Sequence, residues 1–153
     1  MFNLFHKKTE KGTNVDIREK YRVSSHTAYD GVPCVYYDIY LHDSNVKAGT
    51  IDLRLSAEGD MYYYGNIGYR IQPKFRGNHF AYEACQLLFK VAREEFNMDE
   101  LIITCSPDNI ASKKTLEKLG GTLVEKADVP KNHTLYCSGE KEKLIYRYRI
   151  KMN

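Results

Sequence analysis

Residues 67–121 constrain the fold more than any other part of the chain, because they read without interruption as strand, basic turn, helix, strand and helix. Apolar residues recur at helical spacing between Phe80 and Phe96, which predicts an amphipathic helix over residues 78–96. The apolar run 101–105 then predicts a buried strand. A strand reached through a crossover helix has a parallel neighbour, so we expect the strand before the helix to lie beside it.

Alternating apolar and polar residues predict further strands on both sides of this segment. Residues 33–41 and 51–55 alternate in this way, and residues 62–71 predict a third, longer strand. Gly65 and Gly68 interrupt that strand, which indicates a bulge or the close approach of another backbone. The last strand alternates from Leu144 to Ile150. The predicted fold class is therefore α/β (α+β), with a mixed, mostly antiparallel twisted sheet flanked by helices.

Length and composition indicate one ordinary globular domain over residues 1–153. We expect residues 1–30 to form a helical or irregular lead-in and residues 33–150 to form the core. Apolar residues make up 42% of the chain and charged residues 28%, and no apolar run approaches the ~18 residues of a membrane span. The N-terminus is too polar for a secretory signal, so cytoplasmic residence and no membrane partner are the default expectations.

The cysteine and histidine spacings argue against a disulfide framework and against a metal site. The four cysteines are far apart and include no CxxC pair, which favours reduced and mostly buried thiols. The five histidines have no partner three or four residues away, so we expect no metal.

Charge is distributed unevenly around the predicted basic turn. No Asp or Glu occurs between Asp60 and Glu83, and this gap contains Arg70, Lys74 and Arg76. The gap is either an exposed basic loop or an electrostatic cradle for phosphates. A helix that begins after Gly77 would direct unpaired backbone N–H groups and a partial positive charge at an anion in the turn.

The chain resembles the GNAT superfamily of N-acetyltransferases over roughly residues 33–150. The pyrophosphate turn of that family, R/Q-x-x-G-x-G/A, is matched by residues 76–81, and its later asparagine motif is matched from Asn109 through the helix ending at Gly120. The pattern is closest to the branch that includes the ribosomal-protein N-terminal acetyltransferases. The resemblance implies a parallel, splayed central strand pair and acetyl-CoA as cosubstrate.

The resemblance also implies which residues bind acetyl-CoA. Backbone donors of the turn would hold the pyrophosphate, the strand before it would pair with the pantetheine arm, and the later motif would contact the pantetheine amides. His79 departs from the pattern because it stands where the family usually has glycine, and it is compatible with the turn if it keeps helical dihedrals. The expected cofactor-binding residues are Tyr69, Arg70, Ile71, Arg76, Gly77, Asn78, His79, Phe80, Ala81, Tyr82, Asn109 and Ser112. The alternative for Asn109 is a plain helix cap, and the alternative for Ser112 is an ordinary residue of the first helical turn.

The catalytic acid and base are not given by the motifs. Thr104 and Leu116 occupy the positions where the ribosomal-protein acetyltransferases have a glutamate base and a tyrosine acid. Asp52 and Tyr64 are the candidates instead, because both precede the cofactor strand. A solvated strand face is the alternative for Asp52, and a packing role is the alternative for Tyr64.

Three functions are consistent with the sequence. The first is direct transfer of acetyl from acetyl-CoA to a primary amine of a small molecule or a protein N-terminus. The alternatives are a catalytically inactive CoA-binding sensor or partner-binding module and, third, a nucleic-acid-binding domain. We expect an amine acceptor as partner, no nucleic acid, and a homodimer if the alternating last strand offers a free edge.

Overall fold

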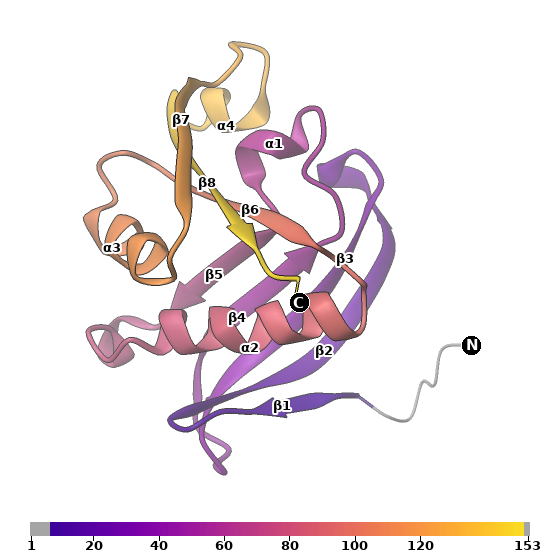
Figure 1. Ribbon diagram of the computed structural model, residues 1–153, viewed down its shortest axis with the longest axis vertical. Coiled ribbons are helices and arrows are strands. Elements are labelled where there is room, and N and C mark those ends of the chain that lie inside the picture. Colours follow the sequence, from indigo (N-terminus) through magenta and orange to yellow (C-terminus); the bar gives the residue numbers. More distant parts are fainter. Residues whose placement is uncertain (1–6, 152–153) are drawn as a thin grey trace.

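The computed structural model describes residues 7–151 and contains two antiparallel sheets (Figure 1). The first sheet has the order β1-β2-β3-β4-β5, and the second has the order β6-β8-β7. The strands of the first sheet are β1 (Thr9–Lys11), β2 (Val15–His26), β3 (Val32–Leu41), β4 (Lys47–Arg54) and β5 (Ile67–Ile71). Those of the second sheet are β6 (Glu100–Cys105), β7 (Thr122–Asp128) and β8 (Glu142–Arg149). The helices are α1 (Met61–Tyr64), α2 (Phe80–Glu94), α3 (Ile110–Lys118) and α4 (Thr134–Cys137), with short 3-10 turns η1 (Thr27–Tyr29) and η2 (Pro73–Phe75).

The predicted α+β fold class is confirmed, since helices and antiparallel strands form one structure. The expected single mixed sheet is wrong, because the described strands form two sheets with antiparallel ladders and no parallel ladder joins the strand before α2 to the strand after it. Helix α2 covers one face of the first sheet and carries the chain from β5 to β6 (Figure 1). The buried face of α2 is the apolar face that the sequence spacing predicts. Its buried residues are Ala84, Cys85, Leu88, Val91 and Ala92. The crossover strand of residues 101–105 is also confirmed, as β6.

β5 and β6 lie side by side at one end and diverge at the other (Figure 1). They form no ladder, and they meet where the backbone N–H of Asn66 donates to the Ile102 carbonyl at 2.7 Å. The Asn66 side chain accepts in return from the Ile102 N–H at 2.8 Å. Gly65 fits this junction because its φ is 74° and a Cβ there would lie 2.9 Å from the Ile102 oxygen. The predicted close backbone approach at Gly65 is thereby confirmed, and the gap beyond it opens toward α3.

The predicted irregular lead-in is wrong for most of its length. Residues 1–6 lie outside the described part of the chain, but β1 and the long strand β2 follow, and β2 pairs with β3 along its length. Val15 and Ile17 are fully buried in the core, and Asp16 between them is buried on the other face. Charged residues in β2 obscure the alternation of apolar and polar residues that identifies a strand. The partners of the buried Asp16 are His42 and Asp43, which lie in a distant turn, so the local sequence does not reveal that this position is buried.

Two other strand predictions also need correction. Residues 62–71 do not form one strand, since α1 ends at Tyr64 and β5 begins only after the sharp turn at Gly65. β8 is not a free edge, because it pairs with β6 on one side and β7 on the other. β8 therefore offers no free edge through which a homodimer could form.

The two sheets share one hydrophobic core that α2 and α3 complete. Its members come from both sheets, for example Ile51, Leu88, Ile103, Leu116 and Tyr146. Cys34, Cys85 and Cys105 are buried and free, and Cys137 is exposed and free, as the cysteine spacing predicts. Among the described residues, no helix is long and apolar enough to cross a membrane.

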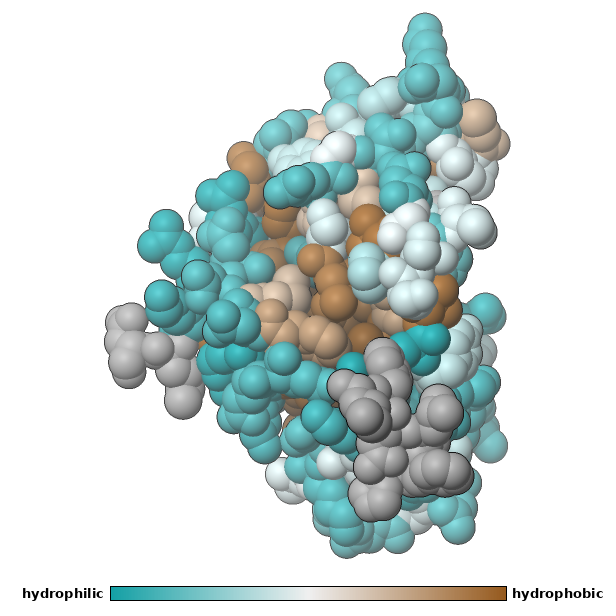
Figure 2. Space-filling model, turned by 90° about the vertical axis from the view of Figure 1, so that its right-hand side faces the viewer, coloured by the Kyte–Doolittle hydropathy of each residue, from teal (hydrophilic) through white to brown (hydrophobic). Residues whose placement is uncertain are grey.

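The side of the molecule that lies at the right in Figure 1 is mostly covered by polar side chains (Figure 2). Apolar side chains gather in a depression at the middle of that side (Figure 2). Helix α3 lies on the opposite side of the molecule, at the left in Figure 1.

Candidate functional site

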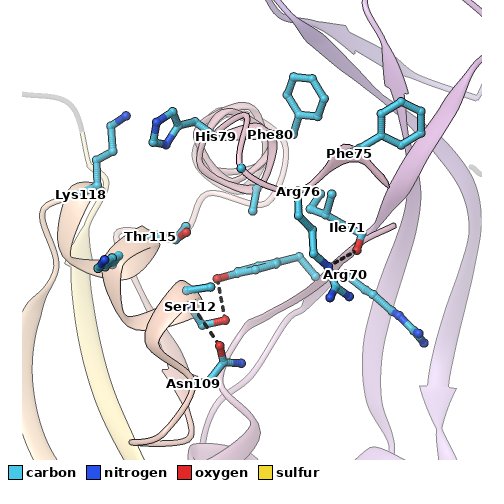
Figure 3. A pocket seen from close by; sticks show the side chains of 15 residues that line it. Arg70, Ile71, Phe75, Arg76, His79, Phe80, Asn109, Ser112, Thr115 and Lys118 are labelled. Atoms are coloured by element: carbon cyan, nitrogen blue, oxygen red, sulfur yellow. Dashed lines mark hydrogen bonds between the residues drawn. The ribbon is translucent and has the colours of Figure 1, made fainter. Parts of the chain in front are cut away.

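A cavity of about 560 Å³ lies where β5, the start of α2 and helix α3 meet (Figure 3). Its lining includes all of the predicted cofactor-binding residues except Asn78 and Tyr82. The side-chain amide of Asn78 instead donates to the Phe75 carbonyl at 3.0 Å and closes the turn. The lining residues from the predicted set are Tyr69, Arg70, Ile71, Arg76, Gly77, His79, Phe80, Ala81, Asn109 and Ser112.

Five further residues that the motifs do not predict line the cavity, and four of them lie on α3. They are Phe75, Ala111, Lys114, Thr115 and Lys118. The four on α3 have the spacing i, i+3, i+4 and i+7, which places them on one face of a helix. That spacing was a usable signal once the motif at Asn109 had fixed where the helix begins.

The turn before α2 presents several backbone donors to the cavity. Gly77 has a φ of 84° and His79 a φ of 60°, so both adopt the left-handed conformation. Histidine tolerates that region better than most residues, but the expectation of right-handed helical dihedrals at His79 is wrong. The first bond of the helix runs from the Glu83 N–H to the His79 carbonyl at 3.1 Å. Within the described chain, the N–H groups of residues 77–82 have no partner, which suits them to an anion.

The edge of β5 supplies further backbone groups. Bonds from Arg54 N–H to the Asn66 carbonyl and from Gln72 N–H to the Ala48 carbonyl fix the register between β4 and β5. Antiparallel pairing alternates, so Tyr69 and Ile71 direct their N–H and C=O groups toward the gap. The backbone of Arg70 faces β4 instead, although its side chain lines the cavity. An extended ligand in the gap would therefore pair with alternate residues of β5.

Polar side chains on α3 face this strand. Asn109 caps the helix by accepting from the Ser112 N–H at 3.2 Å (Figure 3). The Tyr69 hydroxyl donates to Ser112 Oγ at 3.2 Å. Burial raises the pKa of Tyr69 to about 12, so this hydroxyl stays protonated at neutral pH.

The lining of the cavity is basic and contains no acidic side chain. Arg76 Nε donates to the Ile71 carbonyl at 3.0 Å, which holds this guanidinium beside the turn (Figure 3). Lys114 and Lys118 come from α3, on the other side of the cavity. Unpaired N–H groups, a strand edge and basic side chains together fit an elongated ligand that carries phosphates.

The two predicted catalytic residues lie outside this cavity, on the opposite face of the first sheet. Asp52 pairs in register with Gly68, and a Cβ on Gly68 would lie 3.0 Å from Asp52 Oδ1. Arg54 Nε lies 3.1 Å from Asp52 Oδ2. Burial raises the pKa of the Asp52 carboxyl, and the Arg54 guanidinium offsets part of this rise. Arg54 also donates to the Tyr64 carbonyl at 2.9 Å, which ties the end of α1 to this pair.

The side chains at the positions of the missing acid and base have structural contacts. Thr104 Oγ1 donates to the Tyr63 carbonyl at 2.8 Å, and Leu116 is fully buried. His133 is buried as well, with Nε2 2.9 Å from the Asp60 carbonyl and Nδ1 accepting from the Leu135 N–H at 3.0 Å. None of these three is placed as a free proton acceptor.

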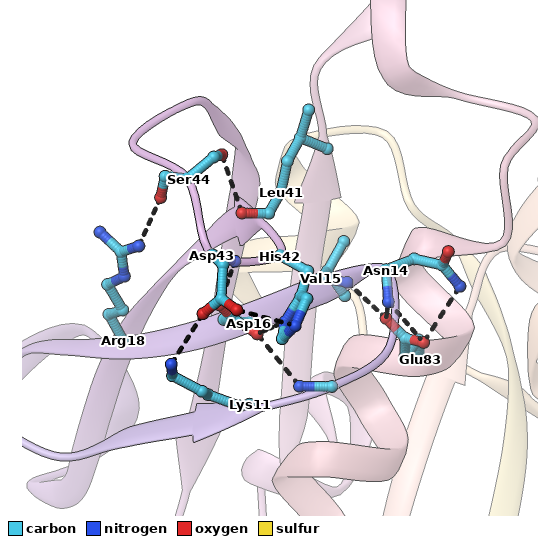
Figure 4. A network of polar contacts seen from close by, with 11 residues as sticks. Lys11, Asn14, Val15, Asp16, Arg18, Leu41, His42, Asp43, Ser44 and Glu83 are labelled. Carbon is cyan, nitrogen blue, oxygen red and sulfur yellow. Dashed lines mark hydrogen bonds and ion pairs between the residues drawn. The ribbon is translucent and has the colours of Figure 1, made fainter.

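Asp16, His42 and Asp43 bring three ligand-type atoms within 4.8 Å of one another, which their sequence spacing does not reveal. These atoms already have protein partners (Figure 4). Lys11 Nζ lies 2.7 Å from Asp43 Oδ1, and Asp16 accepts from His42 and from the Asp43 and Gly12 N–H groups. The cluster therefore acts as a link between two turns.

Comparison with known proteins places this architecture in a family. The family model described as "Acetyltransferase (GNAT) domain" matches residues 6–122. An uncharacterized N-acetyltransferase of Bacillus subtilis, YnaD, is 32% identical over 62 residues, a match that covers 38% of this chain and 36% of that protein.

Solved structures share the fold at lower identity. An acetyltransferase from Agrobacterium tumefaciens has a TM-score of 0.66 at 20% identity, with 97% of this chain and 99% of that chain covered. RimL, a ribosomal alpha-N-protein acetyltransferase in complex with coenzyme A, has a TM-score of 0.59 at 19% identity, with 76% of this chain and 62% of that chain covered. The chain thus spans less than two thirds of RimL and matches about a third of YnaD. From the family-model match over most of its length, the chain belongs to the GNAT acetyltransferase family.

Proposed function

We propose that this protein is an acetyl-CoA-dependent N-acetyltransferase that transfers acetyl directly to a primary amine. The observation that carries the proposal is the single cavity in which the turn before α2, the edge of β5 and the capped start of α3 converge. The coenzyme A in the RimL structure supports the same ligand for this cavity. We further propose that residues 1–153 act as one domain, because both sheets contribute to one core.

Each part of the cavity has a role toward the cosubstrate. The N–H groups of residues 77–82 would bind the pyrophosphate, and hydrogen bonds to charged groups contribute roughly 1.5–3 kcal/mol each. That exceeds a helix dipole contribution of roughly 0.3–1 kcal/mol, so these donors dominate the binding energy. Tyr69 and Ile71 would pair with the pantetheine arm, and Asn109 and Ser112 would add polar contacts.

Acetyl-CoA supplies an activated thioester, and the chain must supply a proton acceptor for the amine. Asp52 is the proposed base for an amine that approaches from the face of the sheet opposite the cavity, because its carboxyl lies against Gly68, next to Tyr69, which lines the cavity. A pKa raised by burial makes this carboxylate a better proton acceptor than an exposed one. Tyr64, whose backbone is held by Arg54, is the proposed acid.

The buried cysteines support direct transfer without a covalent enzyme intermediate. Burial raises the pKa of Cys85 and Cys105, which suppresses the reactive thiolate of both. Cys85 is also fully inaccessible in α2. If acetyl accumulated on a cysteine in the absence of an amine, direct transfer would be excluded.

Calorimetric titration with acetyl-CoA tests the binding site, using two glycine variants as a matched pair. Gly77 and Gly120 have φ values of 84° and 86°, and neither would bring a Cβ within 4 Å of another group. Gly77→Ala and Gly120→Ala should therefore suffer similar backbone strain, of about 1 kcal/mol. Only Gly77 lines the cavity, so only Gly77→Ala should lose acetyl-CoA affinity. Equal loss in both variants, or no binding by the wild type, would refute the site.

A second candidate function is a CoA-binding module without transferase activity. The observation that favours it is the replacement of the expected acid and base by Thr104, which bonds to α1, and by the buried Leu116. Thiol release from acetyl-CoA distinguishes the two, measured with an N-terminal peptide, a polyamine and an amino sugar as acceptors. Turnover with any amine supports the enzyme, whereas tight binding without turnover across the panel supports the module.

A further inference from the structure

We infer that His79 and Lys118 bind the terminal phosphomonoester of the nucleotide of coenzyme A, at the outer rim of the cavity. This inference rests on the proposed function, because it adds a second phosphate site to the same cofactor cavity. It also gives a purpose to His79, the residue that departs from the expected motif.

His79 is placed to contact a ligand and not to support the fold. It is exposed, and its ring has no hydrogen-bond partner among the described residues. Its φ of 60° is unfavourable for a residue with a Cβ, so glycine or asparagine would fit the backbone at least as well. The left-handed backbone turns the side chain away from the axis of α2 and toward α3 (Figure 3).

Lys118 reaches the same rim from α3. Its side chain and that of His79 extend to the same end of the cavity, from two different elements (Figure 3). Lys118 Nζ lies 4.5 Å from the centre of the Tyr82 ring, which orients the ammonium over the first turn of α2. Lys114 lines the cavity one helical turn earlier, and no acidic side chain is part of the lining.

The positions of the binding groups along the cavity indicate which phosphate lies at this rim. The pantetheine arm would lie along β5, and the pyrophosphate would accept from the unpaired N–H groups of residues 77–82. The nucleotide lies on the other side of the pyrophosphate, so it must extend past the outer rim. Coenzyme A carries a phosphomonoester on its ribose, and a phosphomonoester bears ≈ −1.5 to −2 charge at pH 7. The Lys118 ammonium complements that charge, and the His79 imidazole supplies an N–H donor to the phosphate oxygens.

The test compares coenzyme A with dephospho-coenzyme A, which lacks only the phosphomonoester, by calorimetric titration of the full chain. The wild type should bind coenzyme A about tenfold more tightly than the dephospho compound. His79→Asn keeps a residue suited to the left-handed backbone, and Lys118→Met keeps the aliphatic stem over Tyr82. Each variant should lower that ratio to threefold or less while binding the dephospho compound as the wild type does.

Lys113→Met is the matched control, because it removes the same charge from α3 at a residue that does not line the cavity. It should keep the tenfold ratio. Equal affinity of the wild type for both compounds would overturn the inference and leave the cofactor site intact. Loss of binding to both compounds in the His79 and Lys118 variants would also overturn it, because the residues would then act on the pyrophosphate. Failure of the wild type to bind either compound would instead refute the proposed function.

Discussion

The Tyr69 hydroxyl donates a 3.2 Å hydrogen bond to Ser112 Oγ and so joins β5 to α3 across the cavity. Tyr69→Phe removes this bond and should lower the free energy of unfolding by about 0.5–1.5 kcal/mol, measured by urea denaturation. Ser112→Ala should have a similar effect, and the double variant should lose less than the sum because both changes remove one interaction. Additive losses would show that the two side chains do not interact.

Glu83 ties the loop between β1 and β2 to the first turn of α2 (Figure 4). Its carboxylate accepts from the Asn14 N–H at 2.9 Å and from the Val15 N–H at 2.6 Å. Glu83→Ala leaves two backbone donors unpaired and should lower the free energy of unfolding by about 2–3 kcal/mol. Glu94→Ala, at an exposed position of the same helix, should change it by less than about 0.5 kcal/mol. Denaturant unfolding of both variants checks this, and equal effects would contradict it.

The contact between Asp16 and His42 should make stability depend on pH. The hydrogen bond to Asp16 raises the pKa of His42 above its ordinary 6.5. Burial acts to raise the pKa of Asp16, but hydrogen bonds from His42, Asp43 and Gly12 outweigh it and lower this pKa below 3.8. The His42 contribution is therefore complete below pH 6.5 and is lost as pH rises through the raised pKa. The Asp16 contribution is present above pH 3.8 and is lost as pH falls through the lowered pKa.

His42→Gln tests this pH window by urea denaturation between pH 5 and pH 9. The wild type should be more stable than the variant at pH 5.5, and the difference should shrink as pH rises past the raised pKa of His42. A difference that stays constant from pH 5 to pH 9 would show that the ion pair between His42 and Asp16 does not form.

Asp52→Asn should lower kcat by roughly 10²–10⁴-fold if Asp52 is the base, with unchanged affinity for acetyl-CoA. Asp38→Asn is the matched control, since Asp38 lies on the same face of the sheet and pairs with Lys47 at 2.9 Å. It should retain kcat within about threefold of the wild type. Steady-state kinetics and calorimetry on both variants separate the outcomes, and full turnover by Asp52→Asn would remove Asp52 from the mechanism.

Local sequence determined the parts of the site that depend on neighbouring residues. The turn at Gly77, the buried face of α2 and the cap at Asn109 each follow from contacts within about one helical turn. Helical periodicity, capping and the conformational freedom of glycine act over this short range, so the residues reveal them directly. The strand and helix that bound the cavity could be predicted for the same reason.

Only the tertiary structure decided the features that depend on distant partners. β2 is a strand because β1 and β3 pair with it and because the Asp43 N–H, in a turn far along the chain, donates to Asp16. Taken alone, its charged sequence predicts an irregular segment. β8 has no free edge because β7 returns beside it, and Asp52 faces Arg54 and Gly68 on the side away from the cavity. Lys118 and His79 line the same cavity only because α3 packs near the start of α2. Periodicity shows which face of an element is buried, whereas long-range packing decides what lies opposite that face.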